Sequence, residues 1–147
     1  MGTLSDDERA QAAQARGDAG LDDPGVAAAA RALVTFPSAY PDRDYQVRIE
    51  CPEFTAVCPM TGQPDFGRFL IEYVPGERVL ELKSLKLYLG AFRNVGIFHE
   101  TVTNKVLDDL RRALEPRRIT VTAVYAPRGG ITTTVAVEWP DRDPPGS

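Results

Sequence analysis

The chain has 147 residues, of which 43% are hydrophobic, so it is long enough for one domain with a substantial core. Its longest apolar runs are far too short to cross a bilayer, and its start lacks the basic and hydrophobic stretches of a secretory signal. The two cysteines lie seven residues apart and do not make a disulfide framework. We therefore expect a cytoplasmic protein with both thiols reduced and no membrane partner.

The net charge of −4 is concentrated in residues 1–32, which carry six acidic residues against three arginines. The remainder is nearly neutral and offers no basic footprint for direct binding to a nucleic acid. Residues 1–32 also hold ten alanines and no aromatic residue, a composition that buries too little apolar surface to offset chain entropy. We expect a disordered or loosely helical tail at 1–32, the working domain at 33–139 and a second disordered tail at 140–147.

Within the domain, alternating apolar residues predict strands near 45–49 and 69–73, and a short strand at 79–82 follows a turn. The pattern becomes helical at 85–92, and three- and four-residue spacing predicts a second helix over 96–114, which Pro116 ends. Residues 119–125 and 131–139 alternate again around a turn at 126–130. This order predicts an α+β fold with two helices on one face of an antiparallel sheet. Such a small sheet leaves apolar area uncovered, so we expect assembly through sheet edges.

Cys58 lies in a turn-forming run, Cys58-Pro-Met-Thr-Gly-Gln-Pro-Asp65, and loops held by a scaffold are where reactive groups tend to lie. A thiol suits attack on an electrophilic carbon because sulfur is a strong nucleophile that is already partly ionised near neutral pH. Asp65 could exchange protons beside it if the carboxyl group were partly buried. The plainer interpretations are a buried structural cysteine, which also suits Cys51, and a turn-forming aspartate.

The other polar groups of interest lie at the starts of the two predicted helices. Glu100, beside the only histidine, His99, could be a first-turn acid favoured by the helix dipole, or could accept two parallel hydrogen bonds from a guanine-like edge. Lys83 and Lys86, with Ser84 between them, could form a solvated helix face or bind phosphates. No Gly-x-Gly-x-x-Gly run follows a strand, and the histidine and cysteines are unsuitably spaced for zinc. We therefore predict neither a Rossmann-type site nor a metal site.

Together these residues resemble a known family. The run Cys58–Asp65, the run Glu81-Leu-Lys-Ser-Leu-Lys86 and the run Phe98-His-Glu100 are similar, in order and spacing, to the short single-domain type of NADPH-dependent 7-cyano-7-deazaguanine reductase of queuosine biosynthesis. Met60 stands where valine is more usual, which is a conservative change. The resemblance implies the tunnelling fold, in which two hairpins flank two helices and the subunits of a homo-oligomer join their sheets into a barrel with active sites at subunit interfaces.

The resemblance also implies the reaction and the residues. The family reduces a nitrile to a primary amine with two NADPH. By position, Cys58 would attack the nitrile carbon to form a covalent thioimide, and Asp65 would move protons to and from it. Glu100 would hold the deazaguanine base, and His99 would line the pocket near the reacting carbon. The residues expected to contact NADPH are Lys83, Ser84, Lys86 and Arg128.

Two alternatives stay open. An amidotransferase of the same fold would form the same thioimide on a deazaguanine already inside tRNA and would accept ammonia instead of hydride. The intact Glu81–Lys86 run and the missing basic patch count against it. A non-catalytic oligomer that only holds a purine-like ligand through Glu100 would leave Cys58 and Asp65 idle.

Overall fold

The structure is a computed structural model that describes residues 3, 5–8 and 20–141. Its elements in chain order are α2 Pro24–Arg31, β1 Thr35–Pro37, β2 Val47–Val57, β3 Pro64–Val74, β4 Arg78–Leu80, α3 Leu82–Gly90, α4 His99–Leu114, β5 Arg118–Tyr125 and β6 Thr134–Trp139. The predicted order of strands, two helices and strands is confirmed, with β4 as the predicted short strand and with α2 and β1 added before β2.

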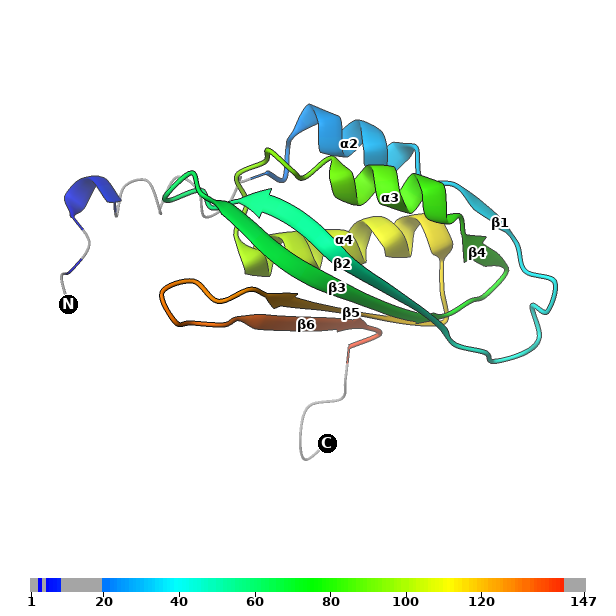
Figure 1. The fold of residues 1–147 in the computed structure, drawn as a ribbon. Helices are drawn as coiled ribbons and strands as arrows, with labels where there is room; N and C mark the ends of the chain where they lie inside the picture. The colour runs from blue at the N-terminus through cyan, green and yellow to red at the C-terminus, as the bar shows by residue number, and fades with distance from the viewer. Residues whose placement is uncertain (1–2, 4, 9–19, 142–147) are drawn as a thin grey trace.

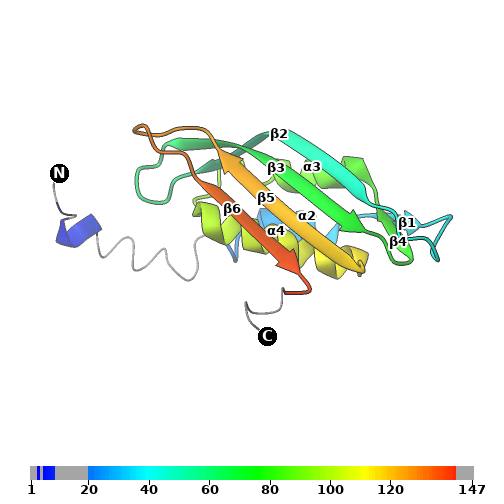
Figure 2. The same ribbon diagram turned by 90° about the horizontal axis from the view of Figure 1, so that it is seen from below.

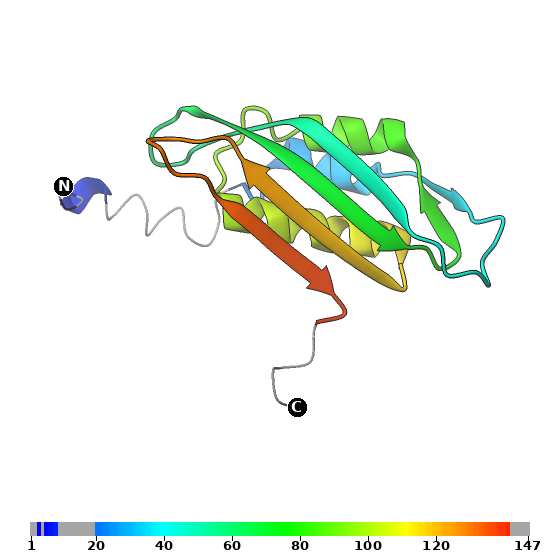
Figure 3. The same cartoon turned by 60° about the horizontal axis from the view of Figure 1, so that its bottom comes forward.

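Four strands form an antiparallel sheet in the order β2-β3-β5-β6, and β1 pairs with β4 in a separate two-stranded sheet. The helices all lie on one face of the larger sheet (Figures 1 and 2). Figure 3 shows its four strands side by side, with β2 and β6 at the two edges. The opposite face of the sheet is not covered by any element of the described residues.

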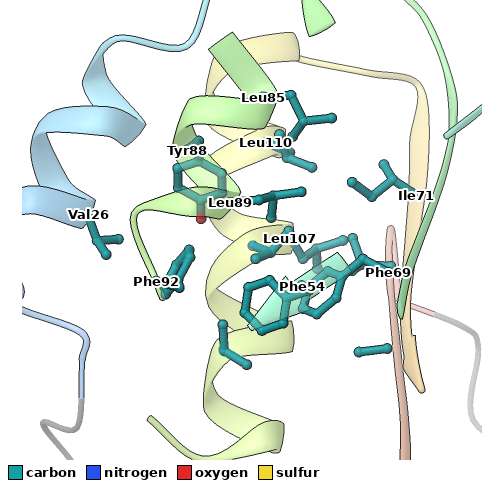
Figure 4. Packing of buried hydrophobic residues seen from close by; sticks show 14 of the residues in the cluster. Val26, Phe54, Phe69, Ile71, Leu85, Tyr88, Leu89, Phe92, Leu107 and Leu110 are labelled. Atoms are coloured by element: carbon teal, nitrogen blue, oxygen red, sulfur yellow. The ribbon is translucent and has the colours of Figure 1, made fainter. Parts of the chain in front are cut away.

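Alternation along β3 and β5 separates the two faces of this sheet. The odd-numbered residues of β3 are buried on the side of the helices, whereas Phe66 on the other side is 57% exposed. Aromatic rings dominate the core, where Phe54 packs 4.4 Å from Phe69 and 5.8 Å from Phe92, measured between ring centroids (Figure 4). Asp65, the second residue of β3, and Tyr125, the last residue of β5, therefore face the helices rather than solvent.

The helix starts differ from the predictions for local reasons. Helix α3 begins before Leu85 because the Glu81 carboxylate accepts hydrogen bonds from the amides of Lys83 and Ser84, at 2.8 and 2.7 Å. These bonds lower the pKa of Glu81. Helix α4 begins only at His99 because the preceding residues are held extended by a parallel bridge between Val57 and Gly96. Strand β6 begins at Thr134 and not at 131, since the turn extends further than predicted.

The predicted tail at 1–32 is wrong for Pro24–Arg31, which form a helix packed against the core. Asp23 caps α2 through the amide of Val26, at 2.9 Å, and Pro24 occupies the first turn, where a missing N–H costs nothing. Val26 has no exposed surface and belongs to the hydrophobic core. Residues 9–19 of that predicted tail, and residues 142–147 of the C-terminal one, lie outside the described residues.

Burial of Val26 predicts that α2 contributes to stability. Val26→Asp should lower the free energy of unfolding by at least about 2 kcal/mol, because it removes a buried valine and places a carboxylate in the core. Ala28→Asp, on the exposed side of the same helix, should lower it by less than about 1 kcal/mol. Urea titration of both variants measures the difference. Equal losses would show that α2 does not pack as described.

Candidate active site

Asp65 is the centre of a group of polar side chains at one end of the sheet. It is the second residue of β3, faces the helices and is only 8% exposed. Its Oδ1 lies 2.6 Å from Arg128 Nη2, and its Oδ2 lies 3.2 Å from His99 Nε2. A carboxylate removed from water needs such donors to offset its lost hydration. The predicted partial burial of Asp65 is present, and the structure joins it to His99 and Arg128.

A tight hairpin turn places Arg128. The backbones of Arg128 and Ile131 exchange two hydrogen bonds of 3.0 Å, and the intervening Gly129 and Gly130 have φ of 58° and 78°. Positive φ at both central positions is the type I′ geometry that glycine adopts without strain. From this turn the guanidinium also donates to the carbonyl oxygen of Pro64, at 3.0 Å. Arg128 thus ties the β5–β6 turn to the start of β3.

The parallel bridge near the end of β2 places His99. Val57 donates to the carbonyl of Val95 and accepts from the amide of Ile97, both at 3.0 Å. This holds the segment before α4 beside the end of β2, so that His99 starts the helix close to Asp65. His99 is partly buried, and Glu100 follows it as an exposed acid in the first turn. The structure therefore places Glu100 beside the same group of residues.

Cys58 follows β2 directly and opens the loop to β3. Its amide donates to the carbonyl of Gln63 at 2.8 Å, and its carbonyl accepts from Gly62 at 2.9 Å, which closes the loop. Partial burial raises the pKa of the thiol, but hydrogen bonds from Thr61, Met60 and the Arg128 side chain outweigh it, so the pKa of Cys58 lies below its usual value. The thiol is partly exposed. These are the surroundings of a reactive cysteine, whereas burial raises the pKa of Cys51.

The residues predicted to contact NADPH do not lie together. Arg128 faces Asp65 and the Cys58 loop. Ser84 is buried, and its hydroxyl accepts from the amide of Val34 at 3.0 Å and donates to the carbonyl of Glu81 at 2.9 Å. Its position gives the cofactor prediction no support. Lys83 and Lys86 are exposed on α3, as the prediction requires.

A cavity of about 550 Å³ lies between β2 and α3. Lys86 and Arg93 line it together with apolar residues of both elements, and Glu50 and Glu53 contribute opposite charge. Cations beside a cavity of this size suit the phosphates of a nucleotide cofactor. Cys51 lines the cavity, but neither Cys58 nor Asp65 does.

The two halves of the predicted site lie at opposite ends of one chain. Helix α3 starts at the end of the domain that holds β1 and β4, whereas the β2–β3 and β5–β6 turns lie at the other end (Figure 1). Leu82, at the start of α3, lines the same cavity as Ile49 of β2. Cys58 comes nine residues after Ile49, just past the end of β2. At about 3.3 Å per residue, Ile49 and Cys58 are roughly 25–30 Å apart along the strand. One copy therefore does not bring Lys83 to Cys58.

Sequence reasoning missed Tyr125 at this site. The rings of Tyr125 and His99 lie stacked, with centroids 3.6 Å apart and planes inclined by 4°. In the sequence, Tyr125 is only the last apolar residue of an alternating strand, which indicates a core residue. Its place beside a turn that carries Arg128 is the one signal that could have drawn attention to it.

In the described part of the chain, no group of three or more His, Cys, Asp or Glu residues is placed to hold a metal ion. None of its helices is long and apolar enough to cross a membrane.

Comparison with known proteins agrees on one family. A family model described as QueF-like protein matches residues 64–144. A protein of Anaeromyxobacter sp. (strain Fw109-5), named NADPH-dependent 7-cyano-7-deazaguanine reductase, is 56% identical over 77% of this chain and 93% of its own length. A protein of Syntrophus aciditrophicus (strain SB) with the same name is 58% identical over 74% of this chain and 78% of its own.

A solved structure supports the fold. The crystal structure of the archaeosine synthase QueF-Like in the apo form matches with a TM-score of 0.61 and 25% sequence identity, covering 66% of this chain and 95% of that chain. With the observed strand and helix order, this match confirms the predicted tunnelling fold.

The contacts of Arg128 predict its effect on the thiol. Arg128→Met should raise the pKa of Cys58, because it removes a hydrogen bond that favours the thiolate. The pH profile of alkylation by iodoacetamide should therefore move to higher pH, measured in a Cys51→Ala background so that one thiol reacts. Arg68→Met, an exposed arginine on β3, is the matched control and should leave the profile in place. An unchanged profile in Arg128→Met would contradict the described contact.

Proposed function

The chain belongs to the QueF-like protein family, and we propose that it reduces the nitrile of 7-cyano-7-deazaguanine to 7-aminomethyl-7-deazaguanine with NADPH, in the biosynthesis of tRNA queuosine. The observation that carries the proposal is the buried Asp65 in contact with Arg128 and His99, at the end of the sheet where the Cys58 loop begins. The lowered pKa of the Cys58 thiol supports it. The curated relatives with the same named activity support the choice of substrate and cofactor. The two free thiols suit a cytoplasmic enzyme.

Cys58 supplies the covalent step. Its sulfur adds to the nitrile carbon, one of the carbon–nitrogen π bonds breaks, and the nitrogen takes up a proton to give a thioimide. A nitrile is a poor hydride acceptor, whereas this carbon–nitrogen double bond can be protonated and reduced, so one difficult step becomes two easier ones. NADPH supplies the hydride when it is bound. After the first hydride has added to the thioimide carbon, the carbon–sulfur bond breaks to leave an imine, and the Cys58 thiolate is returned to the contacts that stabilise it. A second hydride and a proton then convert the imine into the primary amine.

Asp65 and His99 handle the protons. The Asp65 carboxylate contacts Arg128 through Oδ1 and His99 through Oδ2. The arginine is always charged, whereas an imidazole can donate or accept a proton. A proton can therefore pass between the imidazole and the carboxylate at Oδ2. Glu100, exposed beside His99, would accept the ring N–H and the amino group of the deazaguanine.

Lys83 and Lys86 would hold the cofactor phosphates from a second copy of the chain. The separation of these lysines from Cys58 within one copy supports a homo-oligomer whose sites lie at subunit interfaces. Each copy would then contribute the Cys58 loop to one site and the start of α3 to another. The exposed edges of β2 and β6 and the uncovered sheet face support the same assembly.

The amidotransferase and the binding-module alternatives share this fold, so the site has to separate them. The archaeosine synthase structure shows that the fold occurs in a synthase as well. Exposed Lys83 and Lys86 would suit the phosphates of NADPH and of tRNA alike, so it is the named activity of the curated relatives that favours the reductase over the amidotransferase. A lowered pKa at Cys58 has no purpose in a module that only holds a purine.

The direct test of this function is a coupled kinetic and mass measurement. With 7-cyano-7-deazaguanine, the protein should consume two NADPH for each nitrile, and without NADPH it should gain the mass of one substrate. Cys58→Ala should lose the adduct and at least roughly a thousandfold in turnover, because the covalent route is gone. Cys51→Ala is the matched control and should keep both. An adduct without NADPH oxidation would indicate the amidotransferase, and neither signal would indicate the binding module.

The shared site predicts complementation between inactive variants. Cys58→Ala and a Lys83→Ala/Lys86→Ala double variant should each be inactive alone, and their co-expressed mixture should recover part of the wild-type activity. The recovered sites would combine Cys58 from one variant with the lysines of the other. A mixture of Cys58→Ala with Asp65→Ala is the control and should recover nothing, since both residues come from the same copy. No recovery in the first mixture, with mixed oligomers demonstrated by two affinity tags, would place each site within one copy.

A further inference from the structure

The Tyr125 ring, which stacks on His99, lies over a glycine of the neighbouring strand. Tyr125 is the last residue of β5 and pairs in register with Gly67 of β3. A Cβ atom at Gly67 would lie 3.0 Å from Cδ1 and 3.1 Å from Cε1 of the Tyr125 ring, closer than side chains normally pack. The ring therefore leans over the strand at the point where a side chain is missing. Gly67 makes room for this orientation of Tyr125.

The stacked Tyr125 ring restricts a rotation of the His99 imidazole that the other contacts of the site allow. The start of α4 places the Cα of His99, but the imidazole can still rotate about its side-chain bonds. Its bond to Asp65 involves Nε2 alone, which holds one edge of the ring and not its plane. A parallel aromatic ring at 3.6 Å restricts that plane. With both contacts, the imidazole has one orientation.

The hydroxyl of Tyr125 does not explain why the residue is there. It is buried and makes no hydrogen bond of normal geometry among the residues that the structure describes, although the Thr103 side chain, whose hydroxyl donates to the His99 carbonyl, lies close to it. Burial raises the pKa of Tyr125 by more than the Thr103 side chain lowers it, so the phenol stays neutral over the pH range in which enzymes work. Its ring, rather than its hydroxyl, makes the close contact with His99.

From this geometry we propose that Tyr125 is a positioning residue for the reaction: its ring, seated over Gly67, fixes the plane of the His99 imidazole so that Nε2 stays on Asp65. The catalytic part of this inference rests on the proposed function. The geometric part does not, because it concerns the imidazole in the protein alone.

The single histidine allows the geometric part to be measured without activity. In protein labelled with ¹³C-histidine, one imidazole Cε1–H signal should be shifted upfield by the ring current of Tyr125. Tyr125→Phe keeps a ring and should keep the shift. Tyr125→Leu removes the ring and should move the signal toward its position in the unfolded chain. The same signal position in the wild type and in Tyr125→Leu would overturn the proposal.

Kinetics then test whether the orientation matters to the reaction. Tyr125→Leu should lower kcat by about tenfold or more with little change in the KM for NADPH, because misorientation of a proton-transfer group slows the chemical step. Tyr125→Phe should stay within about threefold of the wild type. Equal kcat losses in the Phe and Leu variants would overturn the role of the ring and assign the effect to the hydroxyl.

Gly67→Ala provides a second route to the same conclusion if Tyr125→Leu does not fold. Its added Cβ should displace the Tyr125 ring, so both the histidine signal and kcat should move in the same direction as in Tyr125→Leu. An unmoved signal in a folded Gly67→Ala protein would overturn the proposal. A shifted histidine signal together with a wild type that oxidises no NADPH would refute the proposed function and leave the ring contact standing.

Discussion

A buried carboxylate needs hydrogen-bond donors from the protein itself, and the arrangement of this site follows from the donors that contact Asp65. Its oxygens lie on Arg128 and His99, which come from segments far apart in the chain. Each donor is held by backbone geometry rather than by its own side chain: a two-glycine turn places Arg128, and the Val57–Gly96 bridge places His99. Loss of either donor would leave a charge uncompensated in a region of low dielectric constant. Backbone geometry therefore sets where these side chains lie at the end of the sheet where the chemistry is proposed to occur.

Much of the fold could be predicted from the sequence because its signals are local. Alternation gave the main strands, three- and four-residue spacing gave α4, and Pro116 marked the end of that helix. Helix α2 could not be predicted in the same way. Its alanines are compatible with a free tail or with a helix, and the choice depends on the burial of Val26 against residues much later in the chain. Tertiary contact decided that segment.

The candidate site could be predicted by residue type but not by direction. Motif spacing identified Cys58, Asp65 and His99, and the structure brings Asp65 and His99 into contact. The spacing of motifs could not show that the Ser84 hydroxyl bonds to the backbone, or that Arg128 faces Asp65. Both depend on contacts with residues about 50 or more positions away in the chain. A stacked pair such as Tyr125 and His99 leaves no pattern in a single sequence.

The same local chemistry explains why phosphate binding would depend on lysines and on a second copy. The start of α3 would ordinarily attract an anion, but the Glu81 carboxylate already accepts its free amides. A phosphate would have to be held by the exposed Lys83 and Lys86 instead, on a helix that starts at the end of the domain away from the β2–β3 turn. Hydride transfer needs the cofactor and the reacting carbon in contact. In the proposed assembly another copy would supply the missing half, and the open sheet edges would give the copies a way to join.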